Sequence, residues 1–108
     1  MEQIQTIKEL TLNEINTIDI MAKEWFDKIN GNSYFSANVT LNFSKENQKV
    51  IKLNFQYGYG EQYEYESLME IIRFLNIDYK ETSIYRFCRE NNIILRSNKE
   101  QNCLKRDL

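Results

Sequence analysis

The sequence predicts an α+β fold in which helices pack on one face of a small antiparallel sheet. Two observations carry this prediction. Apolar residues alternate with a period of two over residues 33–57, and segments before and after that region show helical spacing. The chain has 108 residues, of which 42% are hydrophobic and 28% charged, and this is typical of one folded domain spanning residues 1–108. The predicted element order is α-β-β-α-α-β.

The first predicted helix covers residues 11–30. Residues 1–10 alternate only weakly and favour no particular element. Thr11 to Glu14 then have the pattern of a capping box, in which a hydroxyl and a carboxylate serve the free amides of a helix start. Asn30 and Gly31 end the helix, because glycine accepts the left-handed conformation there. The apolar face of this helix consists of Ile15, Ile18, Ala22, Trp25, Phe26 and Ile29.

A β-hairpin of one polar and one apolar face is predicted next. The inward side of its first strand consists of Phe35, Ala37, Val39, Leu41 and Phe43. After a polar connection at residues 44–48, the second strand runs from residue 49 to about 57, with Ile51, Leu53, Phe55 and, as a further candidate, Tyr57 directed inward. Because antiparallel pairing sets the start of one strand beside the end of the next, we expect Tyr34 and Tyr57 to be neighbours.

Helical spacing returns over residues 62–75, with a stripe of Tyr65, Leu68, Met69, Ile72 and Leu75. Thr82 is expected to cap a short third helix that carries Ile84, Phe87 and Cys88 and ends at residues 91–92. Residues 93–96 predict a last strand, and residues 97–108 a pinned tail or a short final helix. The predicted core includes Trp25, Phe26, Val39, Leu41, Leu53, Phe55, Leu68, Ile72 and Phe87.

The composition argues against most enzyme chemistry. Without histidine, the chain lacks the usual general base near neutral pH and the commonest metal ligand. Two cysteines cannot build a cysteine-rich zinc site, and the phosphate-binding and dinucleotide-binding glycine motifs are missing. Paired carboxylates such as Glu61 and Glu64 could in principle act as general acid and base, but this spacing occurs by chance in any helix and does not indicate a catalytic pair. We therefore expect a protein that is not an enzyme and that needs no metal or cofactor.

Charge and targeting signals bear on the compartment. Fourteen basic and sixteen acidic residues give a net charge of −2, which argues against nonspecific binding to nucleic acid. The sequence contains no apolar run near the ~20 residues of a membrane span and no signal-peptide pattern at its start. Cys88 and Cys103 are expected to be reduced thiols, although two cysteines are enough to form one disulfide. These features indicate a cytoplasmic protein that does not bind membranes.

The strand-ending segment 55–63 is the most unusual part of the chain. Gly58 and Gly60 flank Tyr59, and glycine lets backbone approach a ligand while tyrosine rings stack on a base or cover a partner's surface. The alternative is an ordinary turn, in which the glycines supply positive φ and the tyrosines cap the core.

Candidate binding residues gather at one end of the predicted hairpin and on the third helix. At the sheet end, polar and aromatic groups form either a binding site or a solvated edge. Two arginines three residues apart on the helix either hold a phosphate or a partner's carboxylates, or are merely solvated. The full set of candidates is Asn32, Tyr34, Gln56, Tyr57, Tyr59, Arg86 and Arg89.

Three stretches resemble a group of small uncharacterised bacteriophage and prophage accessory proteins. They are WFDKINGNSYFS at residues 25–36, FQYGYG at residues 55–60 and NCLKRDL at residues 102–108. The resemblance covers residues 22–108 in order. It implies an origin in a phage or mobile element and transfers no activity or catalytic residue. Small phage proteins without catalytic motifs often bind a host factor, and inhibitors of CRISPR effectors and other immune systems are examples.

The predicted function is therefore that of an anti-defence inhibitor, anti-CRISPR-like or of another kind, that binds a host defence protein in the cytoplasm of the host cell. Two alternatives stay open. One is a protein that sequesters a nucleotide signal near Tyr34, Tyr57 and Tyr59. The other, ranked lower, is a nucleic-acid-binding accessory protein that uses the basic segment 82–108. A homo-oligomer is compatible with the sequence.

Overall fold

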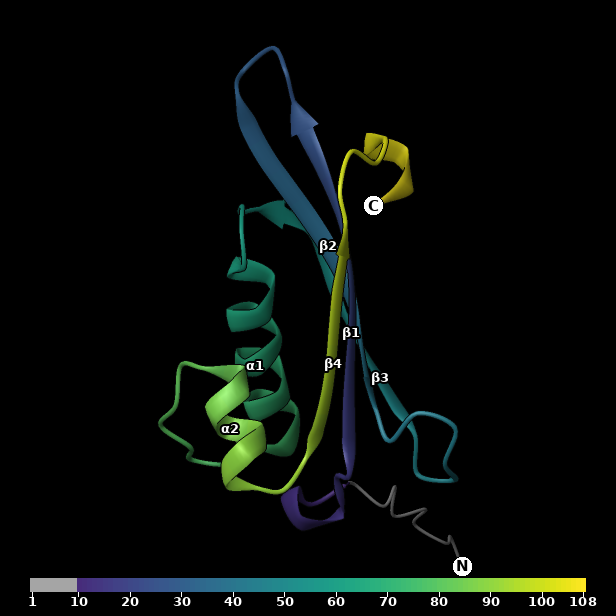
Figure 1. The fold of residues 1–108 in the computed structure, drawn as a ribbon, viewed down its shortest axis with the longest axis vertical. Helices are drawn as coiled ribbons and strands as arrows, with labels where there is room; N and C mark the ends of the chain where they lie inside the picture. The colour runs from purple at the N-terminus through teal and green to yellow at the C-terminus, as the bar shows by residue number, and fades with distance from the viewer. Residues whose placement is uncertain (1–9) are drawn as a thin grey trace, which may run out of the picture.

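A computed structural model describes residues 10–108, which form a four-stranded mixed sheet and two helices (Figure 1). Residues 1–9, for which the sequence favours no particular element, lie outside the described residues. The predicted α+β class is confirmed. The order of the long elements is β-β-β-α-α-β, because a strand takes the place of the predicted first helix.

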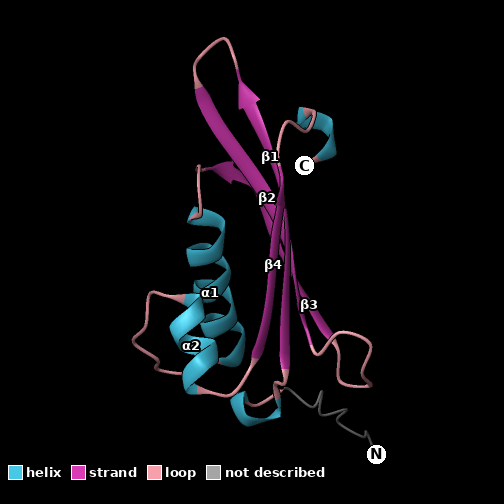
Figure 2. Cartoon of the chain, viewed as in Figure 1, coloured by secondary structure: helices cyan, strands magenta, loops and turns pink. Residues whose placement is uncertain are grey.

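The sheet has the strand order β3-β2-β1-β4. The pairs β1–β2 and β2–β3 are antiparallel, whereas β1 and β4 are parallel, so the sheet is mixed and not purely antiparallel as predicted. The described elements, shown in Figure 2, are the strands β1 (Thr17–Asp27), β2 (Asn32–Leu41), β3 (Lys49–Tyr57) and β4 (Ile94–Glu100), the helices α1 (Gln62–Leu75) and α2 (Ile84–Glu90), and 3-10 turns at Leu12–Glu14 and Lys105–Asp107.

Strand β1 contradicts the predicted first helix. Its buried residues Ile18, Ile20 and Ala22 follow a period of two, and β1 pairs with β2 on one side and β4 on the other. The Thr11–Glu14 motif is formed, with the Thr11 amide 2.9 Å from Glu14 Oε1, but it caps only one 3-10 turn. Gly31 has a φ of 72°, as a helix end would require, yet it lies in the turn between β1 and β2. Pairing with two neighbouring strands outweighs the local helical spacing.

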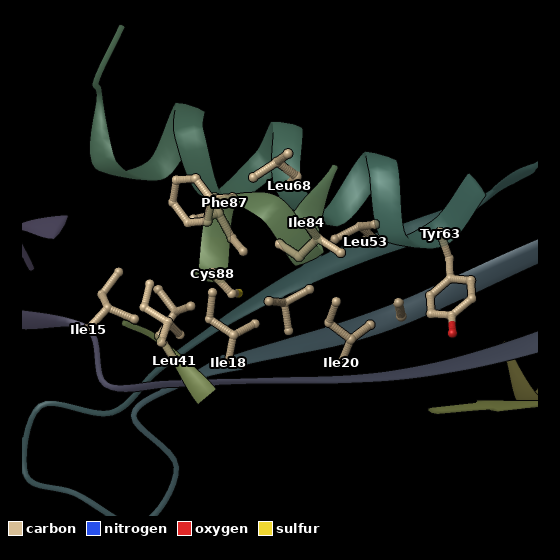
Figure 3. Close-up of a cluster of buried hydrophobic side chains, with 14 of the residues drawn as sticks. Ile15, Ile18, Ile20, Leu41, Leu53, Tyr63, Leu68, Ile84, Phe87 and Cys88 are labelled. Carbon is tan, nitrogen blue, oxygen red and sulfur yellow. The ribbon is translucent and has the colours of Figure 1, made fainter. Parts of the chain in front are cut away.

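Both helices cover one face of the sheet, and the core lies between them and the strands (Figure 3). Figure 3 shows Ile18, Ile20 and Leu41 of the strands directed toward Leu68 of α1 and Phe87 of α2. Five of the predicted core residues are buried there: Val39, Leu41, Leu53, Leu68 and Phe87. We call the opposite side of the sheet, which neither α1 nor α2 covers, the open face.

A β-bulge in β3 decides which side chains reach the open face. Ala37 pairs with Leu53, but the next pair recorded along the strands is Phe35 with Gln56, so β3 contains one residue more than β2 in this interval. The extra residue inverts the alternation. The prediction that Phe55 and Tyr57 point toward the helices is therefore wrong. Their side chains lie on the open face and are 40% and 55% exposed.

Other burial predictions are also wrong. Trp25 is half-buried on the open face, and Phe26 is exposed near the end of β1. Phe43 is exposed because Asn42, with a φ of 57°, ends β2 after Leu41. In α1 the buried stripe is rotated relative to the prediction, so Tyr65 is exposed and Ile72 only half-buried; the stripe consists of Tyr63, Glu64, Ser67, Leu68, Ile71 and Leu75.

The C-terminal elements follow the prediction more closely. Ser83, one residue after the expected cap, accepts a hydrogen bond from the Arg86 amide at 3.3 Å. Ile84, Phe87 and Cys88 are buried as predicted, and both cysteines are free. The last strand continues to residue 100, beyond the expected 93–96. A single 3-10 turn follows at residues 105–107.

The molecule is elongated, with extents of 57 × 37 × 25 Å. Figure 1 shows the reason: the turn between β1 and β2 projects beyond the start of α1. Ile29 lies in this turn and is 92% exposed. Within residues 10–108, we find no helix with the length and apolar character needed to cross a membrane.

Candidate functional site

Four aromatic side chains gather on the open face, and we call them the aromatic surface: Trp25 of β1, Tyr34 of β2, and Phe55 and Tyr57 of β3. Tyr34 stacks on Phe55 with 5.0 Å between ring centroids and 12° between planes. Trp25 stacks on Tyr34 at 5.6 Å. Tyr57 meets the Tyr34 ring edge-on at 5.8 Å. Side chains from three strands therefore form one continuous aromatic cluster.

Strand pairing explains why these rings meet. Tyr34 is paired with Trp25 on one side and with Tyr57 on the other, so the neighbourhood predicted for Tyr34 and Tyr57 is confirmed. Side chains at directly opposed positions of adjacent strands are close enough for ring contact. The bulge adds Phe55 to the same face, where its ring also lies 6.3 Å from that of Trp25. Without the bulge, Phe55 would point toward the helices.

A lysine from the end of the chain lies over two of these rings. Lys105 Nζ is 5.3 Å from the ring centroid of Trp25 and 5.9 Å from that of Phe55. Both distances lie within the range of cation–π attraction. The backbone amide of Cys103 donates to the carbonyl of Glu24 at 3.0 Å, and this bond brings the segment toward β1.

Asp27, at the end of β1, adds a negative charge near this lysine. The pKa of the Asp27 carboxyl lies below its ordinary value, mainly because the Asn30 side chain donates a hydrogen bond to it. The backbone amides of Asn30 and Ile29 lower this pKa further, and the positive charge of Lys105 acts in the same direction. Asp27 is therefore ionised near neutral pH and attracts Lys105.

The other candidates at this sheet end are distributed on different sides. Asn32 is paired with Asp27 beside the projecting turn, and Tyr59 is exposed in the connection from β3 to α1. Gln56 pairs with buried Phe35, is half-buried, and its Nε2 donates to the Asn54 carbonyl at 3.0 Å. The structure therefore brings Tyr34 and Tyr57 together but directs Gln56 to the helix-covered side.

Arg86 and Arg89 do not join the aromatic surface. They are exposed on α2, which packs against α1 and β4 on the helix-covered side of the sheet. Arg86 Nε lies 3.4 Å from Glu81 Oε1, so an intramolecular carboxylate already pairs with this guanidinium. A phosphate or partner carboxylate bound by Arg86 and Arg89, as the sequence predicts, would therefore lie on the opposite side of the sheet from Tyr34 and Tyr57.

The glycines after β3 have structural roles. The Gly58 amide donates to the Ser33 carbonyl at 3.0 Å, and a Cβ at Gly58 would lie 2.6 Å from the Phe35 ring. Gly60 has a φ of 61°, which glycine adopts without strain. The two glycines thus shape the turn from the sheet into α1, and Tyr59 between them remains exposed.

A hydroxyl network around Glu64 forms a second polar cluster, on the helix-covered side. Glu64 is 6% exposed, and its Oε2 accepts hydrogen bonds from Tyr85 at 2.7 Å, Ser97 at 2.7 Å and Tyr63 at 3.3 Å. These bonds connect α1 with α2 and β4. Three donors compensate the burial of the carboxylate, and the network holds the helices against the sheet.

An ion pair lies beside this network. Lys99 Nζ is 3.4 Å from Glu24 Oε2 and donates to the Gly60 carbonyl at 2.7 Å; the side chains of Lys99 and Glu24 are each 12% exposed. Sequence reasoning missed both clusters. Apart from the neighbours Tyr63 and Glu64, the bonded side chains lie 21 to 75 positions apart in the chain, so no local motif marks the clusters.

The Glu64 network should make stability depend on pH in the alkaline range. The hydrogen bond to Glu64 is the main cause that raises the pKa of Tyr85 above its ordinary 10.0, and burial is the main cause for Tyr63. The stabilisation is fully present below pH 10.0 and is lost as pH rises through the higher folded-state values. As pH rises above about 10, we expect Tyr85→Phe to lose less stability than the wild type, measured by urea unfolding. Equal pH slopes would contradict this assignment.

Neither a search for metal sites nor comparisons with known proteins assign a role to these residues. Among residues 10–108, the structure places no group of three His, Cys, Asp or Glu side chains where they could hold a metal ion. A scan of protein-family models, a search of curated proteins and a search of solved structures each find no match to this chain.

Proposed function

We propose that this protein is an anti-defence inhibitor of phage or mobile-element origin that binds a host defence protein through the aromatic surface. The observation that carries the proposal is the gathering of four rings from three strands on the open face. Phe55 and Tyr57 are exposed in this cluster, and exposed aromatic clusters are typical of interaction sites. Such rings give a large contact area for a small loss of conformational entropy.

The origin is supported by the resemblance to phage accessory proteins. The stretch 25–36 contributes Trp25 and Tyr34, the stretch 55–60 contributes Phe55 and Tyr57, and the stretch 102–108 contributes Lys105. The three stretches are far apart in the sequence but meet at the aromatic surface. Their proximity supports a shared recognition surface.

The ring contacts favour a protein partner over a nucleotide. A nucleobase binds by laying its plane on the face of an aromatic ring. Tyr34 stacks on both Trp25 and Phe55. These contacts use ring faces that a base would need. Ring edges and tyrosine hydroxyls remain for contacts with a protein.

Purification of the full chain from its host cell tests this proposal. We expect a host protein to copurify in stoichiometric amount, without nucleotide absorbance and without nucleic acid. Tyr57→Ala should reduce the recovery of that protein at least tenfold, since an exposed tyrosine that becomes buried at an interface contributes about 2 kcal/mol or more. Tyr65→Ala is the matched control, because Tyr65 is also an exposed tyrosine but lies on α1, over the other face.

Each alternative has its own readout in the same experiment. Bound nucleotide would support a sequestering protein, and bound nucleic acid would support the accessory role of segment 82–108. The purified chain should also inhibit the activity of the captured host protein. A captured protein that is not inhibited, or that binds Tyr57→Ala as well as the wild type, would overturn the proposal.

A further inference from the structure

The segment 101–108, which we call the tail, lies on the aromatic surface but is loosely attached to it. None of its eight residues is buried. Its contacts with the sheet include the Cys103 amide bond to Glu24 and the position of Lys105 over Trp25 and Phe55. The Leu104 amide donates to Asp107 Oδ2 at 3.2 Å, which holds the tail's own turn rather than the sheet.

A cavity between the tail and the open face shows the same loose fit. It has a volume of about 210 Å³, and Asp107 and Leu108 of the tail line it together with Met21, Lys23, Asn38 and Lys52 of the sheet. This cavity is partly open to solvent. The tail therefore covers the open face without filling the space beneath it, and little apolar burial opposes its removal.

The place that Lys105 occupies has the chemistry of a cation site. It combines the faces of two aromatic rings with the Asp27 carboxylate, which lies two positions after Trp25 in β1 and therefore on the same face of the sheet. Aromatic faces attract ammonium and guanidinium groups through the ring quadrupole, and a carboxylate adds a full opposite charge. Lysine and arginine side chains of a partner protein match these groups.

We propose that the aromatic surface binds a basic side chain of the partner protein, and that Lys105 occupies this position until the partner displaces it. The proposal rests on the proposed function, since it names the partner's chemistry at the same surface. A tethered group competes with an effective concentration in the millimolar range, so a partner has to offer more contacts than Lys105 alone. The tail thereby selects against weak basic ligands.

Trp25 is the only tryptophan of the chain and reports directly on this position. The probe is a free peptide with the sequence of residues 104–108, blocked at both ends and titrated into the full-length protein while tryptophan emission is followed. We expect the peptide to bind Lys105→Ala about threefold to tenfold more tightly than the wild type, because the internal competitor is removed. Arg106→Ala is the matched control. Within residues 10–108 the cation that lies over the Trp25 and Phe55 rings is Lys105 and not Arg106, so the Arg106→Ala variant should bind the peptide as the wild type does.

Two further arms separate cation binding from general adhesion. A peptide in which glutamine replaces both basic residues should bind at least threefold more weakly to Lys105→Ala than the basic peptide does. Phe55→Leu combined with Lys105→Ala should lose the preference for the basic peptide, while its thermal unfolding confirms that it is folded. Equal binding of both peptides, or equal affinity of Lys105→Ala and wild type, would overturn the inference.

These outcomes are distinct from a failure of the proposed function. If the peptide preference is present but no host protein copurifies, the cation site stands and the anti-defence role fails. If a host protein copurifies and depends on Tyr57 but the peptide preference is missing, the role stands and the displacement of Lys105 is wrong.

Discussion

Replacing Phe35 by alanine is expected to lower the free energy of unfolding by about 3–5 kcal/mol, whereas Phe55→Ala should lower it by only about 1–2 kcal/mol. Phe35 is 2% exposed, faces the helix-covered side and packs against Gly58. Phe55 lies beyond the bulge, on the open face, and loses mainly its ring contacts with Tyr34 and Trp25. Chemical denaturation of both variants measures the difference. Equal losses would mean that β3 has no bulge and that Phe55 is directed toward the helices.

Glu64→Ala should be the second most destabilising change, with a loss of about 2–4 kcal/mol. It leaves the hydroxyls of Tyr63, Tyr85 and Ser97 without their shared acceptor. The bond from Tyr85 joins α2 to α1, the bond from Ser97 joins β4 to α1, and the bond from Tyr63 lies within the first turn of α1. Glu64→Gln keeps an acceptor oxygen and should lose less.

Glu61→Ala is the control for that measurement. Glu61 precedes α1 and is exposed, so its removal should change the free energy of unfolding by no more than about 0.5 kcal/mol. If Glu64→Ala unfolds at the same denaturant concentration as Glu61→Ala, the hydroxyl network does not hold the helices to the sheet.

The hairpin could be predicted from the sequence because its signals are local. Alternation over residues 35–41 marks one strand face, and antiparallel geometry alone places Tyr34 beside Tyr57. The first strand could not be assigned in the same way. Ile15, Ile18 and Ala22 satisfy helical spacing, while Ile18, Ile20 and Ala22 satisfy a period of two. Pairing with β2 and with the distant β4 decides between the two patterns.

The candidate site was predictable in part for a related reason. Tyr34 and Tyr57 follow from pairing, but Trp25 and Phe55 reach the same surface through β1 and the bulge, which no residue near position 54 signals. Lys105 joins from the other end of the chain. Arg86 and Arg89 share a helix face as the spacing implies, yet only the packing of α2 shows that this face is on the other side of the sheet.

The affinity of the captured host protein for Phe55→Ala is the most direct test that the aromatic surface is the recognition surface. We expect a loss of about thirtyfold, or about 2 kcal/mol, in a variant that remains folded at the temperature of the binding measurement. Phe43→Ala, which removes an exposed phenylalanine after the other end of β2, should bind as the wild type does. Normal affinity of a folded Phe55→Ala variant, or an equal loss in both variants, would contradict recognition through the open face.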